Sequence, residues 1–412
     1  MTEVVVQGNA YHHVHVIVDG QTGTHSFKSV SVSRNINTLG STFDITFPNR
    51  WIASQQQFLF VAGKRIRVVL RDKNTILDGF IETISTEVSE KSHFIRITGR
   101  DKTGDLVDCS PSKFPEFSKL TLRQIAEKVC EDFRIKVFDN AKDTHVFDTA
   151  KFRPAETVFN FLNRLSKQRG ILLNSVPIVG GGLSLMRPGT VSYINEKLDY
   201  SNILSCSTSV DISRVFSKYT VISQTNSVVN IEEDAGEIEQ ESNVVATISD
   251  SSVRREVAPG EFIERPMTFI SEKQATNAQA ASRAAWEQVK RLGEMIKISI
   301  VVNGWLTRDG DIWRENRKIK IEYPHAGLDG IYLITGVKYL YGFNESIKTH
   351  LTLTHRNAYT PPPPNRAVTK ANPNENISWD FTKEGLERWS RKQGVRRSDI
   401  FVKPDIPTKE GP

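Results

Sequence analysis

Short runs in which apolar and polar residues alternate recur along the chain, and they constrain its fold more than any other feature. One of them, Phe94–Thr98, reads Phe-Ile-Arg-Ile-Thr. A period of two is typical of a strand with one buried face. Further runs of this kind occupy Val4–Val6, Val14–Val18, Phe27–Arg34, Thr42–Phe47, Lys64–Arg71 and Ile76–Ser85. Short strands at this spacing, separated by turn residues, predict a small antiparallel barrel or sandwich.

The strand pattern returns later in the chain and forms an internal repeat. Strands are expected again from about Val215, and clearly at Ile296–Val302, Arg317–Glu322, Ile331–Tyr341 and Lys348–Thr354. Three pairs of runs occur in the same order: Lys64–Val68 with Arg317–Ile321, Gly79–Ile84 with Gly330–Thr335, and His93–Thr98 with His350–Thr354. The repeat predicts two superimposable β-barrels in one chain.

Between the two strand-rich regions the apolar period becomes helical. Thr121 and Gln124 have the spacing of a capping box and start an apolar helix face that ends near Phe133. A second helix is expected from Pro154 to Gly170. The triple glycine 180–182 predicts a hairpin turn, since no helix or lysine follows as a phosphate loop requires. A third helix is expected from Ser271, capped by Gln274, to Gly293.

These patterns give an α+β, mainly β fold with four parts. The parts are an N-terminal β-barrel (1–98), a helical α/β module with strands (99–214), a second β-barrel with an inserted acidic loop and a helix (215–355), and a Pro-rich, basic C-terminal tail (356–412). The proline run 361–364 predicts an extended start to that tail.

Composition excludes several classes of function. The net charge of +6 over 412 residues is too weak to indicate nucleic-acid binding. The 3 cysteines have no paired or metal-type spacing, and no apolar run is long enough to cross a bilayer. His12, His13 and His15 lack a nearby carboxylate or cysteine to complete a metal site. We expect no cofactor, no metal, no catalytic residue and no membrane insertion, with folding in a cytoplasm.

The segment Gly99–Ser110, Gly-Arg-Asp-Lys-Thr-Gly-Asp-Leu-Val-Asp-Cys-Ser, links the first strand region to the helical module. Its glycines and aspartates are typical of tight turns. Arg100 is expected to pair with a neighbouring carboxylate and to fix the exit from the barrel. We predict that Arg100→Ala lowers stability by about 1–3 kcal/mol, because a partly buried carboxylate would lose its partner.

The same segment resembles the signature of the baseplate hub proteins of Mu-like contractile-tailed bacteriophages. That family is similar in fold to the hubs of larger contractile phages and to the base of type VI secretion spikes. The resemblance extends from the first strands to about His355. It marks a structural motif of Gly99, Arg100, Asp101, Gly104, Asp105, Leu106, Asp108 and Cys109.

The resemblance implies a structural protein of the virion, assembled in the host cytoplasm. It implies a homotrimeric ring that joins the tail tube to the central spike, contacts other baseplate proteins and lets DNA pass without binding it specifically. Three chains with two similar barrels each would match a sixfold tube. Two alternatives stay open, a tail-associated cell-wall hydrolase and a wall-binding module, because the helical module faintly resembles a LysM-like unit.

Overall fold

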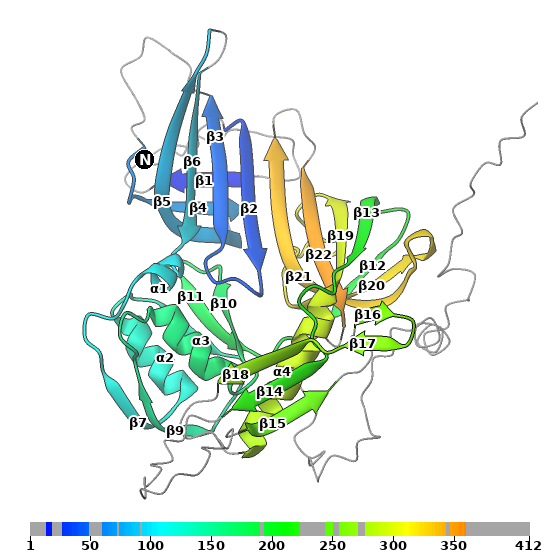
Figure 1. Cartoon of the computed structure of the whole chain (residues 1–412). Coiled ribbons are helices and arrows are strands. Elements are labelled where there is room, and N and C mark those ends of the chain that lie inside the picture. The colour runs from blue at the N-terminus through cyan, green and yellow to red at the C-terminus, as the bar shows by residue number, and fades with distance from the viewer. Residues whose placement is uncertain are drawn as a thin grey trace, which may run out of the picture.

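The computed structural model describes residues 14–18, 27–48, 60–71, 74–90, 93–189, 193–222, 244–249, 255–270, 277–342, 347–356 and 358–359. The expected strand Val4–Val6, His12, His13, the acidic loop and all of the predicted C-terminal tail except residues 356 and 358–359 therefore lie outside the described residues. Strands dominate, and the helices gather in two places (Figure 1). The prediction of a mainly β, α+β fold is confirmed.

One large sheet of 12 strands organises the molecule. From the N-terminal region it takes β1 (Val14–Val18), β2 (Ser29–Asn35), β3 (Thr42–Pro48), β4 (Arg65–Leu70), β5 (Asn74–Val88) and β6 (His93–Asp101). From the later region it takes β12 (Tyr193–Leu198), β13 (Ile203–Val210), β19 (Ile296–Asn303), β20 (Arg317–Tyr323), β21 (Leu328–Gly342) and β22 (Lys348–His355). Residues 193–210, which the sequence analysis grouped with the helical module, thus contribute strands to this sheet.

The sheet consists of two halves with the same strand order. The first half runs β1-β4-β5-β6-β3-β2, and the second runs β12-β20-β21-β22-β19-β13. The pairs correspond and are antiparallel, except that β12 and β20 run parallel. The halves join where β2 pairs with the distal part of β21, from Ser29 opposite Gly342 to Asn35 opposite Gly336. In the described ladders neither half closes on itself, so the observed object is one continuous sheet.

The registers show which residues of the two halves are equivalent. Ile319 and Ile321 take the places of Ile66 and Val68, and all four side chains are fully buried. Both long strands carry a bulge at the same place, after Ile81 in β5 and after Ile334 in β21. The structure thus shifts the second aligned pair of runs by two residues, with Gly79 equivalent to Tyr332, and the C-terminal end of the third pair by two, with Thr98 equivalent to Thr352. Such a shift keeps every side chain on its face, because the strand period is two.

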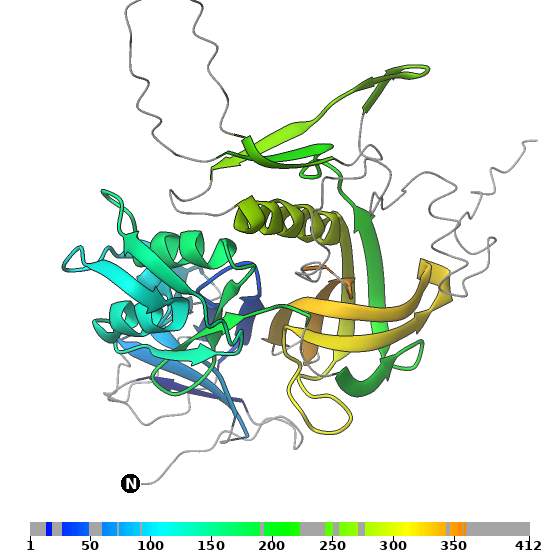
Figure 2. The same ribbon diagram turned by 90° about the horizontal axis from the view of Figure 1, so that it is seen from below.

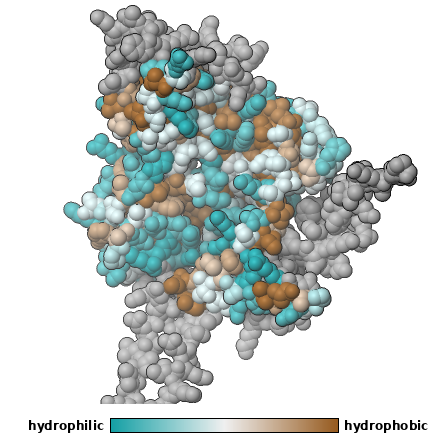
Figure 3. Space-filling model, turned by 45° about the horizontal axis from the view of Figure 1, so that its top comes forward, coloured by the Kyte–Doolittle hydropathy of each residue, from teal (hydrophilic) through white to brown (hydrophobic). Residues whose placement is uncertain are grey.

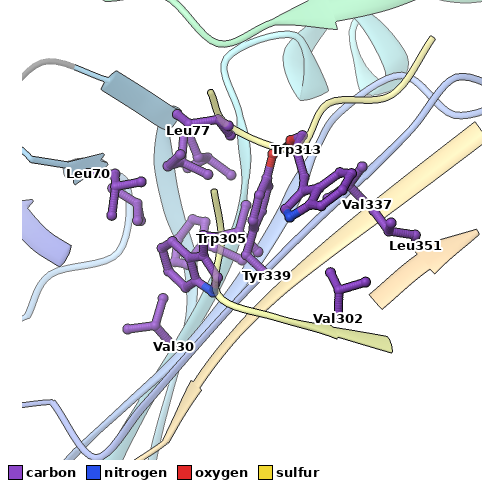
Figure 4. Packing of buried hydrophobic residues seen from close by; sticks show 14 of the residues in the cluster. Val30, Leu70, Leu77, Val302, Trp305, Trp313, Val337, Tyr339 and Leu351 are labelled. Carbon is purple, nitrogen blue, oxygen red and sulfur yellow. Dashed lines mark hydrogen bonds between the residues drawn. The ribbon is translucent and has the colours of Figure 1, made fainter. Parts of the chain in front are cut away.

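The core of the sheet continues across the junction between the halves. Trp305 and Tyr339 pack with their ring centroids 5.4 Å apart, and Val30 of the first half lies close to them (Figure 4). The indole Nε1 of Trp305 donates a hydrogen bond to the carbonyl oxygen of Leu340 at 3.0 Å. Leu70 and Leu77 belong to the same cluster, so both halves share one hydrophobic core.

The helical module follows β6 and lies below the first half of the sheet in Figure 1. Its elements are α1 (Gly104–Asp108), β7 (Glu116–Thr121), α2 (Leu122–Glu131), β8 (Lys136–Asp139), β9 (Val146–Lys151), α3 (Val158–Lys167), β10 (Leu172–Val176) and β11 (Gly182–Met186). The Thr121–Gln124 capping box is confirmed. The predicted start of the second helix at Pro154 is wrong: Ala155 has a φ of 58°, and Thr157 caps the helix instead.

A smaller unit covers the other end of the molecule. β14 (Lys218–Ile222) lies between β15 (Val244–Ser249) and β18 (Pro266–Ile270), and α4 (Asn277–Met295) packs on this sheet (Figure 2). The hairpin β16 (Arg255–Ala258) and β17 (Glu261–Ile263) projects from it, and a single 3-10 turn, η2, spans Pro324–Ala326. The third helix therefore ends beyond Gly293, while Gln274 lies outside the described residues.

Candidate functional site

The segment singled out in the sequence forms the exit from β6 and the whole of α1. Asp101, at the end of β6, is buried and organises the turn. Its carboxylate accepts hydrogen bonds from the Ser41 amide (2.8 Å), the Thr103 amide (2.9 Å) and the Thr103 hydroxyl (2.6 Å). These bonds satisfy backbone donors that would otherwise be buried without partners.

Arg100 pairs with carboxylates, as expected. Its Nε donates to Glu82 Oε1 at 2.8 Å, and its terminal nitrogens donate to both oxygens of Asp108. The hydrogen bond from Arg100 lowers the pKa of Asp108, and the bond to Asp108 is the main cause of the raised pKa of Arg100. The side chain of Asp108 is 55% exposed, so this is a surface pair that links β6 to α1, and the bond to Glu82 links β6 to β5.

Two glycines of the motif sit where a side chain would be crowded, and at Gly99 it would clash with the backbone. A Cβ on Gly99 would lie 2.1 Å from the carbonyl oxygen of Phe80 and 2.9 Å from the Phe43 ring. A Cβ on Gly104 would lie 3.1 Å from the Cβ of Arg100. The glycines therefore allow the close approach of β5, β6 and α1.

The remaining motif residues attach α1 to the helical module. Leu106 is fully buried in the core of that module. Burial is the main cause of the raised pKa of Asp105, in the first turn of α1. Cys109 is exposed, and its carbonyl oxygen accepts a hydrogen bond from the Val158 amide at the start of α3 (3.0 Å). The motif thus forms a structural joint that connects the end of β6 to the helical module. Its role as a family signature stays a prediction.

A buried polar network that the sequence analysis missed lies next to this joint. Arg34 on β2 donates to both carboxylate oxygens of Glu315, at 3.1 and 2.6 Å. Asn174 on β10 donates to Glu315 Oε1 at 3.2 Å, and Arg34 also donates to the carbonyl oxygen of Ser175 at 3.0 Å. The Ser175 hydroxyl lies 2.7 Å from that of Ser41. The network therefore connects both halves of the sheet and the helical module.

The electrostatics of this network fit a structural role. Burial alone would raise the pKa of Glu315, but the charge and hydrogen bonds of Arg34 together lower it. Both side chains are about as buried as a hydrophobic core residue, with exposures of 4% and 5%. A carboxylate held ionised by a bidentate guanidinium cannot readily act as a general acid.

Neither a metal site nor a membrane span appears in the part of the chain that the structure describes. No group of three or more His, Cys, Asp and Glu residues there could hold a metal ion. His15, the one described member of the histidine cluster, is buried in β1. No described helix is both long and apolar enough to span a bilayer.

Family models of phage baseplate proteins match three separate parts of the chain. The N-terminal domain of the GpP-like Mu phage baseplate assembly protein matches residues 13–101. The second domain of the gp44-like baseplate hub protein matches 103–187, and the fourth domain of the Mu phage baseplate assembly protein GpP matches 276–362. The boundary between the first two matches falls at the joint after β6.

Individual relatives agree with this assignment. Baseplate hub protein gp44 of Escherichia phage Mu is 26% identical over 357 residues, covering 84% of this chain and 88% of the relative. The 43 kDa tail protein of prophage MuSo2 from Shewanella oneidensis has the same fold, with a TM-score of 0.70 and 24% identity over 84% of this chain and 99% of its own.

More distant structures share the fold. A tail protein from Neisseria meningitidis gives a TM-score of 0.66 at 20% identity, covering 85% of this chain and 98% of that one. The c3393 protein of E. coli, a component of the type VI secretion system, gives 0.51 at 12% identity, covering 82% and 76%. The sequence relative, the three domain matches and the fold all point the same way: the chain is a homologue of the Mu-like phage baseplate hub proteins, and this homology supports a structural role in the baseplate.

Proposed function

We propose that the protein is a homotrimeric hub ring of a contractile tail, placed between the tail tube and the central spike. The observation that carries this proposal is the duplicated half-sheet. Two halves with one strand order in each chain give six similar units in a trimer. Such a ring would offer near-sixfold contacts to a tube on one side and threefold contacts to a spike on the other.

In this proposal each half of the sheet is the wall of one barrel, and the ring completes its closure. The proposed domain boundaries at residues 98, 214 and 355 describe the same two barrels, except that β12 and β13, which precede residue 214, belong to the second barrel. The spike partner is suggested by the fold shared with the type VI secretion component. Assembly would take place in the host cytoplasm before the virion is complete.

We further propose that the ring is not an enzyme and that DNA passes its lumen without specific binding. The net charge of +6 over 412 residues supports weak rather than tight phosphate contact. Figure 3 shows hydrophilic and hydrophobic residues interspersed on one face of the molecule. Strong clusters of phosphate contacts would slow the passage of DNA.

Light scattering of the purified full-length chain tests the proposal directly. We expect three times the mass of one chain at micromolar concentration, and electron microscopy should show an axial opening. A monomer, or a closed trimer without an opening, would count against the hub. Release of fragments from purified cell wall by the chain would favour the hydrolase instead.

A further inference from the structure

The two terminal strands of the half-sheets, β2 and β13, are equivalent in sequence as well as in position. Through their pairing with β3 and β19, Ser29 of β2 corresponds to Ser205 of β13. The strands then read Ser-Val-Ser-Val-Ser from Ser29 and Ser-Cys-Ser-Thr-Ser from Ser205. The similarity is not visible in the chain order, because β2 and β13 stand at different places in the order of the two halves.

The equivalent strands differ in what lies along their outer edges. The outer edge of β2 pairs with the distal part of β21, from Gly336 to Gly342. In the described ladders β13 pairs with β19 alone. The part of β5 equivalent to that distal part of β21 begins at Thr83, and in the same ladders it pairs with β6 alone. The pairing of β2 with β21 therefore joins the two halves within the chain. The equivalent edges, those of β13 and of β5 from Thr83 onward, are both unpaired in the described ladders.

Side-chain exposure follows the same division. On β2 and the distal β21, Val32 and Tyr339 face each other and are almost fully buried. On the open strands, Val210 of β13 is 67% exposed and Val88 of β5 is 70% exposed. Exposed apolar residues on an unpaired strand edge favour pairing with another chain.

Within one chain, β5 and β13 cannot pair with each other. Along the order of the large sheet, β5 and β13 are separated by β6, β3, β2, β21, β22 and β19. They lie on opposite sides of the molecule in Figure 1. A second copy of the chain, in contrast, presents the edge that each of them lacks.

We propose that β13 of one subunit pairs antiparallel with β5 of the next, in the register that β2 uses on β21. Cys206 then lies opposite Val88, Thr208 opposite Thr86, and Val210 opposite Ile84. The contact rests on the proposed homo-oligomeric hub and names the surface that builds it. It is heterologous, so repeating it gives a ring once the rotation closes.

The chemistry of the two edges supports this register. Val210 meets the half-buried Ile84, and Val88 meets the half-buried thiol of Cys206, so each exposed valine gains an apolar neighbour. Glu87 falls opposite Ser207, which places no like charges across the pair. A register one residue away would turn the apolar side chains to the other face.

A disulfide trap uses the native Cys206. Residues directly opposite each other in an antiparallel pair have Cα atoms about 4.5–5.5 Å apart, which a disulfide can span. The variant Val88→Cys, made in a Cys109→Ser background to remove the exposed thiol, is oxidised with copper phenanthroline. Cys130 is buried, which raises its pKa to about 12, so it stays unreactive. We expect most of the chain to run as covalent multimers on non-reducing gels.

Two matched controls fix the register. Glu87→Cys places the thiol on the opposite face of β5 and should give no cross-link, and Val88→Cys with Cys206→Ser should give none either. The pair Ile84→Cys and Val210→Cys, in a chain that lacks Cys109 and Cys206, should cross-link as a second report. Multimers from Glu87→Cys but not from Val88→Cys would overturn the register.

The mass in solution separates this inference from the function on which it rests. A trimer by light scattering that forms neither cross-link refutes the β13–β5 contact and leaves the hub intact. A monomer without cross-links refutes the trimeric hub itself, and the contact with it.

Discussion

The buried ion pair between Arg34 and Glu315 allows a quantitative test of how the two half-sheets are held together. In Arg34→Met the methionine fills a similar volume, but the Glu315 carboxylate loses both of its guanidinium hydrogen bonds. It keeps the bond from Asn174, at 3.2 Å. Removing one partner of a buried pair costs about 3–5 kcal/mol, because the remaining charge is uncompensated. We expect the free energy of unfolding to fall by that amount.

Urea unfolding followed by tryptophan fluorescence measures this loss, since Trp305 and Trp313 lie in the shared core. The double variant Arg34→Met with Glu315→Leu is the matched control. It removes the stranded charge, so it should recover most of the lost stability. An Arg34→Met protein within about 1 kcal/mol of the wild type would refute the view that this pair is a buried, coupled element.

The pH dependence of the same variant has a defined sign. In the wild type the pKa of Glu315 is lowered on folding, so its stabilising contribution is present above the ordinary glutamate pKa and is lost as the pH falls through the folded value. Without Arg34 the desolvation of Glu315 would raise that pKa instead. The stability difference between wild type and Arg34→Met should therefore shrink from pH 7 toward pH 4.

Three further variants test other parts of the fold by the same urea assay. Arg100→Ala should lower the free energy of unfolding by at most about 1 kcal/mol, less than the sequence suggested, because Glu82 and Asp108 are exposed; a loss above about 2 kcal/mol would contradict this. Gly99→Ala should cost about 1–3 kcal/mol or more, since its added carbon meets the Phe80 carbonyl at 2.1 Å, and more than Gly104→Ala, whose carbon meets the Arg100 side chain at 3.1 Å; equal losses would argue against the close approach. Trp305→Ala should cost about 3–5 kcal/mol, because the indole is fully buried; an unchanged midpoint would show that this core is not shared.

Local patterns in the sequence predicted most of the individual elements. Alternation predicted the strands of the first half-sheet and β19, β20, β21 and β22 of the second, but not β12 or β13. The Thr121–Gln124 spacing predicted a cap that the structure contains. The start of α3 was misplaced because Pro154 suits a first helical turn, whereas the positive φ of Ala155 delays the helix to Thr157. That φ depends on the surrounding structure and leaves no mark in the residue types.

Contacts between residues far apart in the chain could not be predicted from the sequence for the same reason. Arg34 and Glu315 are separated by 281 positions, and Asn174 and Glu315 by 141. Nothing in the local sequence marks any of them as buried. The equivalence of β2 and β13 was hidden in another way, because residues 211–295 separate β13 from β19, the strand with which it pairs. Only the ladder register brings the two Ser-x-Ser-x-Ser runs into correspondence.

One pair of equivalent positions carries different residues at the β2–β21 junction within the chain and at the proposed β13–β5 junction between chains. Arg34 of β2 corresponds to Val210 of β13, one residue beyond the equivalent Ser33 and Ser209 in the ladders with β3 and β19. The junction within the chain forms once, during folding, so it can hold a buried guanidinium that meets Glu315 and the helical module. A junction between subunits must first exist open in water. An exposed valine at such a junction lowers the stability of the free subunit only a little, and it needs no charged partner when assembly buries it. An arginine buried there without a charged partner would disfavour the contact. The substitution therefore fits a junction that is closed by a second copy of the chain.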